Sequence, residues 1–216
     1  MFMSKPDVDP PRTTKEDFFM NKEKLGAKET LKQNFTAFGN LRVMICAALL
    51  AALSIVLGKF LQIPNPFQDF IRISFENTPI IMAGMFFGPF VGAVTGAVAD
   101  LLGCVMYGYT INPIVTFGAA SVGLLSGIVS HYIFKRNVYL KCAFAVLASH
   151  IVGSVVIKSL GLAAWYLSKY EIGLLEFMMW RLLNYLFIGV AEFVIITALL
   201  KNRGFSSQLE RMTRKK

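Results

Sequence analysis

The stretch "NTPIIMAGMFFGPFVGAVTGAVADLLG", residues 77–103, decides the fold. It is almost wholly apolar up to Asp100, and a Gly-Pro pair lies near its middle. A transmembrane helix needs about 20 apolar residues, so the stretch is too long for one span and too short for two ordinary spans with a loop. Because proline and glycine interrupt helices, we predict two short helices, about 76–89 and 90–107, that turn at residues 87–90 on the cytoplasmic side.

The whole chain has the composition of an integral membrane protein. Of its 216 residues 55% are hydrophobic and only 16% are charged, whereas a soluble domain has about 25% charged residues. The apolar runs are continuous and do not alternate with polar residues, which excludes a transmembrane β-barrel. We therefore predict an all-α integral membrane protein. The net charge of +9 does not indicate nucleic-acid binding, because the basic residues lie outside the apolar runs, as in cytoplasmic loops.

Six transmembrane helices account for the apolar runs. Besides the two helices of the opening stretch, we predict spans at about 41–60, 113–134, 139–167 and 177–200. With six spans, 17 of the 22 Lys and Arg residues fall on the side of the two termini. The positive-inside rule then places both the N-terminus and the C-terminus in the cytoplasm.

This topology divides the chain into three parts. They are a cytoplasmic N-terminal segment, a six-helix membrane domain that binds the substrate, and a basic cytoplasmic tail: residues 1–40, 41–201 and 202–216. The N-terminal segment has a loose apolar face, which fits either a helix on the membrane surface or a partly ordered tail.

The outer face then carries three loops, at about 60–75, 108–112 and 168–176. The first loop is the longest and combines aromatic residues with a cation: Phe67, Phe70, Arg72 and Phe75. This combination fits a lid over a ligand, and it also fits an aromatic belt at the membrane interface.

Small residues recur four apart in several spans, so that they share a helix face. The first span has two such pairs, offset by one residue: Ala47 with Ala51, and Ala48 with Ala52. Small residues allow a second helix to approach closely. That helix can belong to this chain or to an external partner, and the broad alanine face of the first span favours the partner.

Sequence motifs of catalysis are absent. The chain has no GxxxxGK[ST], HExxH, CxxC or GxSxG motif, so we expect neither an enzyme nor a metal or cofactor site. We interpret His131 and His150 as structural, because neither has a partner at ligand spacing. Asp100 and Glu192 are the only acids well inside spans, and nothing in the sequence indicates that they pair. We expect Asp100 to cap a helix or to pair locally near the outer end.

A binding or transport protein remains. Polar residues near the predicted outer ends of the spans are candidates to line its cavity: Asn77, Asn112, Lys158, Arg181 and Asn184. Gly and Pro interruptions allow membrane helices to break around such a cavity.

The segment "RISFENTPIIMAGMFFGPFVGAVTGAVADLLG", followed by "GYTINPIVT", resembles the substrate-binding S components of energy-coupling factor (ECF) vitamin transporters, most of all the folate-specific members. The similarity covers about residues 41–200, and Glu76 stands where the family pattern has a glycine. The residues that carry the pattern are Arg72, Phe75, Pro79, Ile80, Gly88, Pro89, Gly92, Asp100, Gly103, Tyr109 and Pro113.

The resemblance implies a high-affinity folate-binding S component in the plasma membrane of a prokaryote. It would capture the vitamin outside and deliver it through a transmembrane coupling subunit driven by two ATPase subunits. The alanine face of the first span, Ala47, Ala48, Ala51 and Ala52, would be the contact with the coupling subunit. Two alternatives stay open: the same role for another vitamin, such as riboflavin or pantothenate, and a membrane assembly subunit without a ligand.

Folate presents a flat pterin, an aminobenzoyl ring and a glutamate with two carboxylates. Aromatic side chains could stack on its rings, amides could read the pterin edge, and cations could meet the carboxylates. The candidates are, for stacking, Phe67, Phe70, Phe75, Tyr107, Trp165 and Trp180; for the pterin edge, Asn77 and Asn112; and for the carboxylates, Arg72, Lys158 or Arg181.

Overall fold

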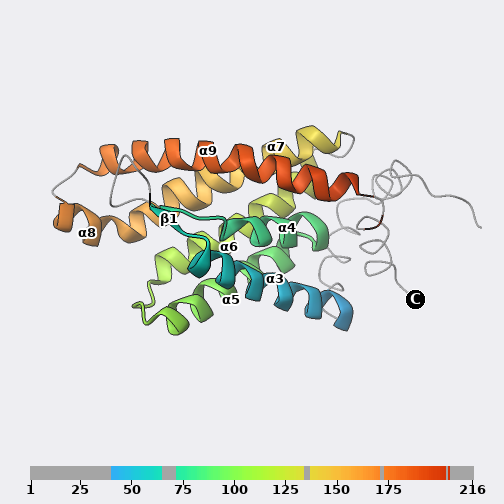
Figure 1. The fold of residues 1–216 in the computed structure, drawn as a ribbon, viewed down its shortest axis with the longest axis horizontal. Helices are drawn as coiled ribbons and strands as arrows, with labels where there is room; N and C mark the ends of the chain where they lie inside the picture. Colours follow the sequence, from blue (N-terminus) through green and yellow to red (C-terminus); the bar gives the residue numbers. More distant parts are fainter. Residues whose placement is uncertain (1–39, 65–71, 134–136, 171–172, 203, 205–216) are drawn as a thin grey trace, which may run out of the picture.

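The computed structural model describes residues 40–64, 72–133, 137–170, 173–202 and 204 (Figure 1). Apart from Asn40 and a few residues after 201, the predicted cytoplasmic segment and the predicted tail lie outside the described residues.

Helices make up almost all of the described chain, which confirms the all-α prediction. In chain order the elements are α3 (Leu41–Phe60), β1 (Ile63–Pro64), β2 (Arg72–Ile73), α4 (Asn77–Phe87), α5 (Pro89–Tyr107), α6 (Pro113–Ile128) continued by η1 (Val129–Ile133), α7 (Val138–Ala148), η2 (Ser149–Ile157), α8 (Lys158–Tyr170) and α9 (Leu174–Lys201). Every predicted span corresponds to one helical run whose ends lie within three residues of the predicted ones.

Five of these runs are long and apolar enough to cross a membrane, judged by length and composition. They are α3, α5, α6 with η1, the run from α7 into α8, and α9. The remaining helix, α4, has 11 residues, which is too short for an ordinary span. A count of six spans therefore stays a prediction.

Local sequence signals explain where the helices begin and end. Asn40 accepts a hydrogen bond from the Arg42 backbone N–H at 3.1 Å and so caps α3, as a side chain at this position typically does. α4 ends at Phe87 and is followed by Gly88, whose φ of 105° favours glycine. α5 begins with the next residue, a proline, at the position where proline suits a helix. This confirms the predicted turn between two short helices.

Helix α4 lies inside the bundle, and all 11 of its residues are buried. It packs against α3, α5 and α6, and more sparsely against α7 and α9. A helix that is apolar all round is expected in such a position. The opening stretch thus contributes the central helix of the fold and one outer neighbour.

Helices α5 and α6 approach each other so closely that their backbones touch. A Cβ atom built on Gly123 would lie 2.0 Å from the carbonyl oxygen of Gly92, and one built on Gly96 would lie 2.2 Å from the carbonyl oxygen of Ala119. The glycine pairs of these two helices therefore serve packing within this chain.

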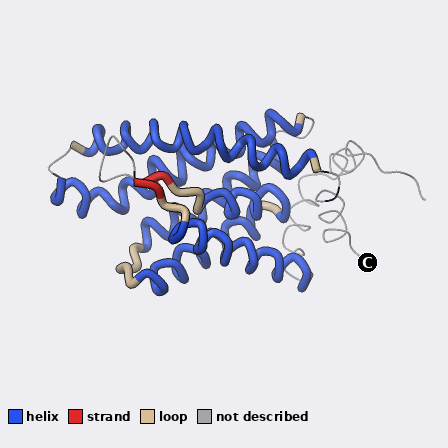
Figure 2. The backbone as a smooth tube through the Cα atoms, in the orientation of Figure 1, coloured by secondary structure: helices blue, strands red, loops and turns tan. Residues whose placement is uncertain are grey.

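The fifth predicted span is a single helical run from α7 to α8 that widens to π-helix over η2. Figure 2 shows it as continuous helix, with no break at its middle. π-helical insertions are often found at functional sites, and η2 leads directly to the buried Lys158 at the start of α8.

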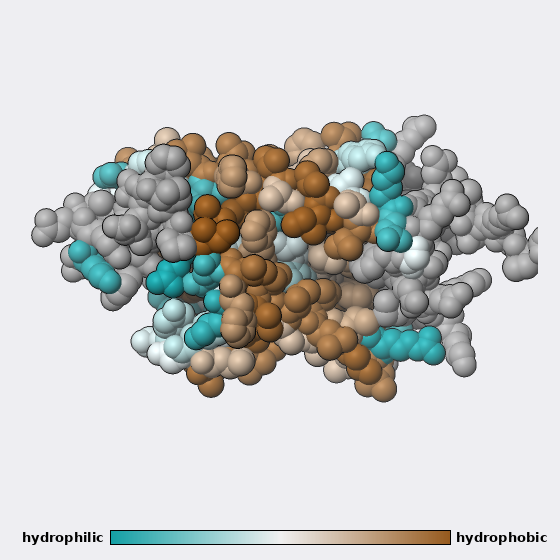
Figure 3. Space-filling model, in the orientation of Figure 1, coloured by the Kyte–Doolittle hydropathy of each residue, from teal (hydrophilic) through white to brown (hydrophobic). Residues whose placement is uncertain are grey.

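The two ends of the bundle differ in what they contain. The start of α3, the α4–α5 turn and the end of α9 gather at one end, while β1 and the α5–α6 connection lie toward the other (Figure 1). On the face drawn in Figure 3, hydrophobic residues occupy the middle and hydrophilic residues lie toward the two ends. β1 and β2 form a short antiparallel ribbon in which Ile63 pairs with Ile73.

Candidate ligand-binding site

A polar pocket opens between α3, α5, α6 and the start of α8, near the β1–β2 ribbon. Its cavity volume is about 110 Å³, which is less than the roughly 300–1,000 Å³ of typical small-molecule sites. The polar side chains in its lining include Ser54, Gln62, Glu76, Asp100, Tyr107, Tyr109 and Lys158.

Two larger hollows have a different character. One lies between the α7–η2 run and α9, and the other between α3 and α5. Neither has a Lys, Arg, Asp or Glu side chain in its wall. The smaller polar pocket is the only one of these three that offers charged groups to a ligand, so we consider it the candidate site.

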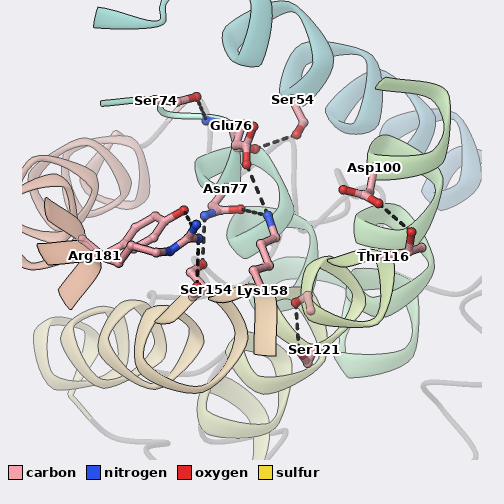
Figure 4. Close-up of polar contacts among 12 residues, drawn as sticks. Ser54, Ser74, Glu76, Asn77, Asp100, Thr116, Ser121, Ser154, Lys158 and Arg181 are labelled. Atoms are coloured by element: carbon pink, nitrogen blue, oxygen red, sulfur yellow. Dashed lines mark hydrogen bonds and ion pairs between the residues drawn. The ribbon is translucent and has the colours of Figure 1, made fainter. Parts of the chain in front are cut away.

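Lys158 lines the pocket and is almost completely buried, and Figure 4 shows it beside Glu76 and Asn77. Its Nζ donates to Glu76 Oε1 at 3.2 Å and to Asn77 Oδ1 at 3.2 Å. Asn77 in turn donates from Nδ2 to the Ser154 hydroxyl at 3.1 Å. This chain joins the start of α4 to η2 and α8, and it supplies the partners that a buried cation requires.

Arg181 of α9 lies beside this chain (Figure 4). Its Nη2 donates to the Ser154 carbonyl oxygen at 3.0 Å and to the Tyr185 hydroxyl at 3.3 Å. The guanidinium also lies 5.5 Å and 5.4 Å from the ring centres of Phe177 and Tyr185, within cation–π range. Its Nε is buried and has no hydrogen-bond partner among the described residues.

Asp100 lines the same pocket from α5. Its Oδ2 accepts a hydrogen bond from the Thr116 hydroxyl at 2.7 Å, which agrees with the expected local pairing. Its second oxygen makes no hydrogen bond to any described residue.

The other predicted residues of this region bond to neighbouring elements. Tyr107 donates its hydroxyl proton to the Ile55 carbonyl oxygen. Arg72 is exposed and bonds Gln62 Oε1 at 2.9 Å, and its carbonyl oxygen accepts from Asn184 Nδ2 at 3.3 Å. Arg72 thus holds the ribbon together, while Asn184 ties α9 to it.

Two predicted polar residues have both ends of their amide occupied by the protein. Asn77 is fully buried within the chain described above. Asn112 accepts from the Ile114 backbone N–H at 3.0 Å, which caps α6, and donates to the Gly161 carbonyl oxygen at 2.6 Å. Both amide side chains, which we expected to bind the pterin edge, therefore make hydrogen bonds that hold helices of this chain together.

The structure describes some of the aromatic residues that we expected to stack on the ligand, and others lie outside the described residues. Phe75 is half-buried next to β2, and Trp180 is half-buried on α9. Phe67 and Phe70 lie outside the described residues, and so does the side chain of Trp165. The choice between a lid and an aromatic belt is therefore untested.

The first-span alanines divide into two pairs. Ala48 and Ala52 are exposed on the outer face of α3, whereas Ala51 is buried and Ala47 is half-buried against the core. Ala47, Ala48 and Ala51 border the hollow between α3 and α5. The exposed pair is the part of this face that an external helix can reach.

Sequence reasoning missed the carboxylate of Glu76 as a member of the site. Its partner Lys158 is 82 positions away, so no local spacing reveals the pair.

A second buried cluster was missed for the same reason. Glu192 bonds His150 Nε2 at 2.5 Å and accepts from the Thr78 hydroxyl at 2.8 Å. His150 therefore has a carboxylate partner, although the sequence showed none.

Comparison with known proteins gives three findings. The profile of the family described as "ECF transporter, substrate-specific component" matches residues 42–202. A curated protein, "Folate transporter FolT" of Clostridium novyi (strain NT), is 42% identical over 65 residues. That match spans 30% of this chain and 36% of the relative, so it covers little more than a third of the curated protein.

Among solved structures, one described as FolT bound with folic acid has a similar fold. The TM-score is 0.56, the sequence identity 23%, and the alignment covers 72% of this chain and 90% of the other. At this identity the likeness concerns the fold alone.

Proposed function

This chain belongs to the family of ECF transporter substrate-specific components, and we propose that it is the member that binds folate. The observation that carries the proposal is the 42% identity to a folate transporter over 65 residues. The likeness of the fold to that of a folate-bound protein supports it, as does a pocket lined by polar and charged side chains.

The pocket and the residues around it offer the types of group that folate requires. Tyr107 contributes an aromatic ring to the wall. Arg72 is exposed near the ribbon, and Arg181 has a buried Nε available for a further bond, so these two cations are our candidates for the glutamate carboxylates.

The transport role follows from the family and is proposed with it. The protein captures the vitamin outside the plasma membrane of a prokaryote and docks on a coupling subunit driven by two ATPase subunits. We place the docking contact on α3, around the exposed Ala48 and Ala52. In this arrangement the chain crosses the membrane six times, with both termini in the cytoplasm, and ATP hydrolysis belongs to the partners.

Ligand identification is the direct test. The full chain is purified in detergent, and mass spectrometry identifies any small molecule that co-purifies. Isothermal titration calorimetry then compares folate with riboflavin and pantothenate, without ATP. We expect folate or a reduced folate to bind tightly. Binding of another vitamin, with no heat from folate or reduced folates, would overturn the proposal.

A variant tests whether the polar pocket is the site. Gly58 lies in its wall, and a Cβ atom there would be 3.3 Å from Glu76 Oε2 and 3.7 Å from the Tyr107 hydroxyl. Gly58→Leu should therefore fill the pocket and weaken folate binding at least tenfold. Gly189→Leu is the matched control, because this glycine borders the apolar hollow beside α9. Equal affinities for the two variants would show that folate binds elsewhere.

A further inference from the structure

The charges in the wall of the polar pocket do not favour an anion. The charged side chains that line it are two carboxylates, Glu76 and Asp100, and one ammonium, Lys158. Folate carries two carboxylates on its glutamate end, and these would enter a pocket whose lining already has an excess of negative charge. The other end of folate, the pterin, is uncharged and carries an amino group beside a ring N–H, which are two neighbouring hydrogen-bond donors.

The ammonium of Lys158 is already neutralised by the protein. Its side chain is 6% exposed, and a Cβ atom on Gly118 would lie 2.6 Å from its Cγ, so the stem fits tightly against α6. The Glu76 carboxylate and the Asn77 carbonyl oxygen accept two of its three protons. A ligand carboxylate that accepted the third proton would have to lie beside the Glu76 carboxylate, a like charge that disfavours it.

Glu76 is held in place by its backbone as well as by Lys158 (Figure 4). The Ser54 hydroxyl donates to the Glu76 carbonyl oxygen at 2.6 Å, and the Glu76 backbone N–H donates to the Ser74 hydroxyl at 3.3 Å. Only its Oε1 is used by Lys158. Its Oε2 lies on the pocket side, near Gly58, and accepts no hydrogen bond from any described residue, while 38% of the side chain is exposed.

We propose that Glu76 is a specificity-determining residue, which neutralises Lys158 from within and presents its second carboxylate oxygen to a hydrogen-bond donor edge of the ligand. The group that enters this pocket is a flat heterocycle with adjacent N–H donors, and the ligand's carboxylates bind outside it. This inference rests on the proposed function and deepens it: the pterin end of folate faces Glu76. A carboxylate that accepts from such donors forms charge-assisted hydrogen bonds, which are stronger than neutral ones.

Calorimetry on the full chain tests this with three ligands. Folate has both ends, pteroate lacks the glutamate, and 4-aminobenzoylglutamate lacks the pterin. For the wild-type protein we expect pteroate to bind within about tenfold of folate, and 4-aminobenzoylglutamate to bind far more weakly.

Glu76→Gln keeps the size of the side chain and removes its charge. We expect it to weaken folate and pteroate by the same factor, about tenfold or more, the size of one charged hydrogen bond. Glu176→Gln on the exposed first turn of α9 is the control and should change neither affinity.

A second variant covers the case in which Glu76→Gln destabilises the fold by leaving Lys158 unpaired. The double variant Glu76→Gln with Lys158→Met removes both charges together. It should fold and show the same loss of pteroate binding.

The outcomes separate the two proposals. If the wild-type protein binds no pteridine, the proposed function fails and this assignment fails with it. If wild-type binding is normal and Glu76→Gln leaves pteroate unchanged, only the assignment fails. Tighter folate binding by Glu76→Gln, with pteroate unaffected, would show that Glu76 competes with a ligand carboxylate for Lys158, which also overturns it.

Discussion

Substituting alanine for Gly123 should separate α5 from α6. The Cβ atom of the new alanine would lie 2.0 Å from the carbonyl oxygen of Gly92 and 2.3 Å from its carbonyl carbon. Both atoms belong to the backbone of α5, so no side chain can rotate away to make room.

The size of the effect follows from these distances. Ordinary contact of a Cβ atom begins at 3.4 Å, so the two backbones must move apart by about 1.4 Å. This movement would also loosen the contact of Gly96 with Ala119 and that of Gly84 with α6. Overpacking of a tight core costs typically 1–3 kcal/mol. For a chain of this length each kcal/mol lowers the unfolding temperature by about 2–4 °C, so we expect a decrease of about 2–12 °C.

The assay is thermal unfolding of the purified protein in detergent, followed by the loss of the monodisperse peak in size-exclusion chromatography. Gly103→Ala is the matched control, since Gly103 lies inside the neighbouring helix α5 and a Cβ atom there has no neighbour closer than 3.7 Å. Both variants gain the same intrinsic helix propensity. If Gly123→Ala unfolds at or above the temperature of Gly103→Ala, then α5 and α6 do not pack as described, and the reasoning is refuted.

Three further outcomes are expected. Ala52→Trp, on the exposed face of α3, should keep folate binding but abolish folate uptake by cells that also express the coupling and ATPase subunits. The control Val190→Trp, exposed on α9, should keep both binding and uptake. Unimpaired uptake by the Ala52→Trp variant would exclude this face of α3 as the docking contact. Glu192→Ala leaves the His150 ring and the Thr78 hydroxyl, both buried, without their acceptor, so the free energy of unfolding should fall by about 3–5 kcal/mol. For Glu176→Ala, exposed on the same helix, the free energy of unfolding should fall by less than about 0.5 kcal/mol. Equal unfolding temperatures of the two variants would contradict the pairing of Glu192 with His150. Asn112→Ala removes a helix cap and should lower the free energy of unfolding by about 1 kcal/mol, while the folate affinity should change less than threefold. A tenfold or larger loss of folate affinity in calorimetry would show that Asn112 contacts the ligand.

The fold was largely predictable from the long apolar runs and from the glycine and proline residues that interrupt them. Long apolar runs can satisfy their backbone groups in a membrane only as helices, and this fixed the number and the limits of the helical runs. The Gly-Pro pair predicted a turn between the two helices. The structure has this turn at Gly88, whose φ of 105° is one that residues other than glycine rarely adopt. The same argument could not show that α4 is wholly buried, since an all-apolar helix gives no face to distinguish lipid from protein.

For the candidate site, the sequence predicted which polar residues could gather, but not what each of them contacts. Polar residues at one depth of several spans indicated a cavity near the predicted outer end, and Lys158 and Asn77 do meet there. The role of each residue could not be predicted from its type and position alone. Asn112 caps a helix, and Ala51 is buried within the chain, because the same residue types serve packing and capping as well as binding.

The sequence by itself determined that this protein is a bundle of membrane helices with a tight central turn, because hydrophobicity and backbone restrictions act along neighbouring residues. Only the tertiary structure decided which charges face one another. Glu76 and Lys158 are 82 positions apart, and His150 and Glu192 are 42 apart. The packing of whole helices brings a buried charge to its partner. It places two carboxylates beside Lys158 in the lining of the polar pocket, although Lys158 was one of the cations expected to meet the ligand's carboxylates.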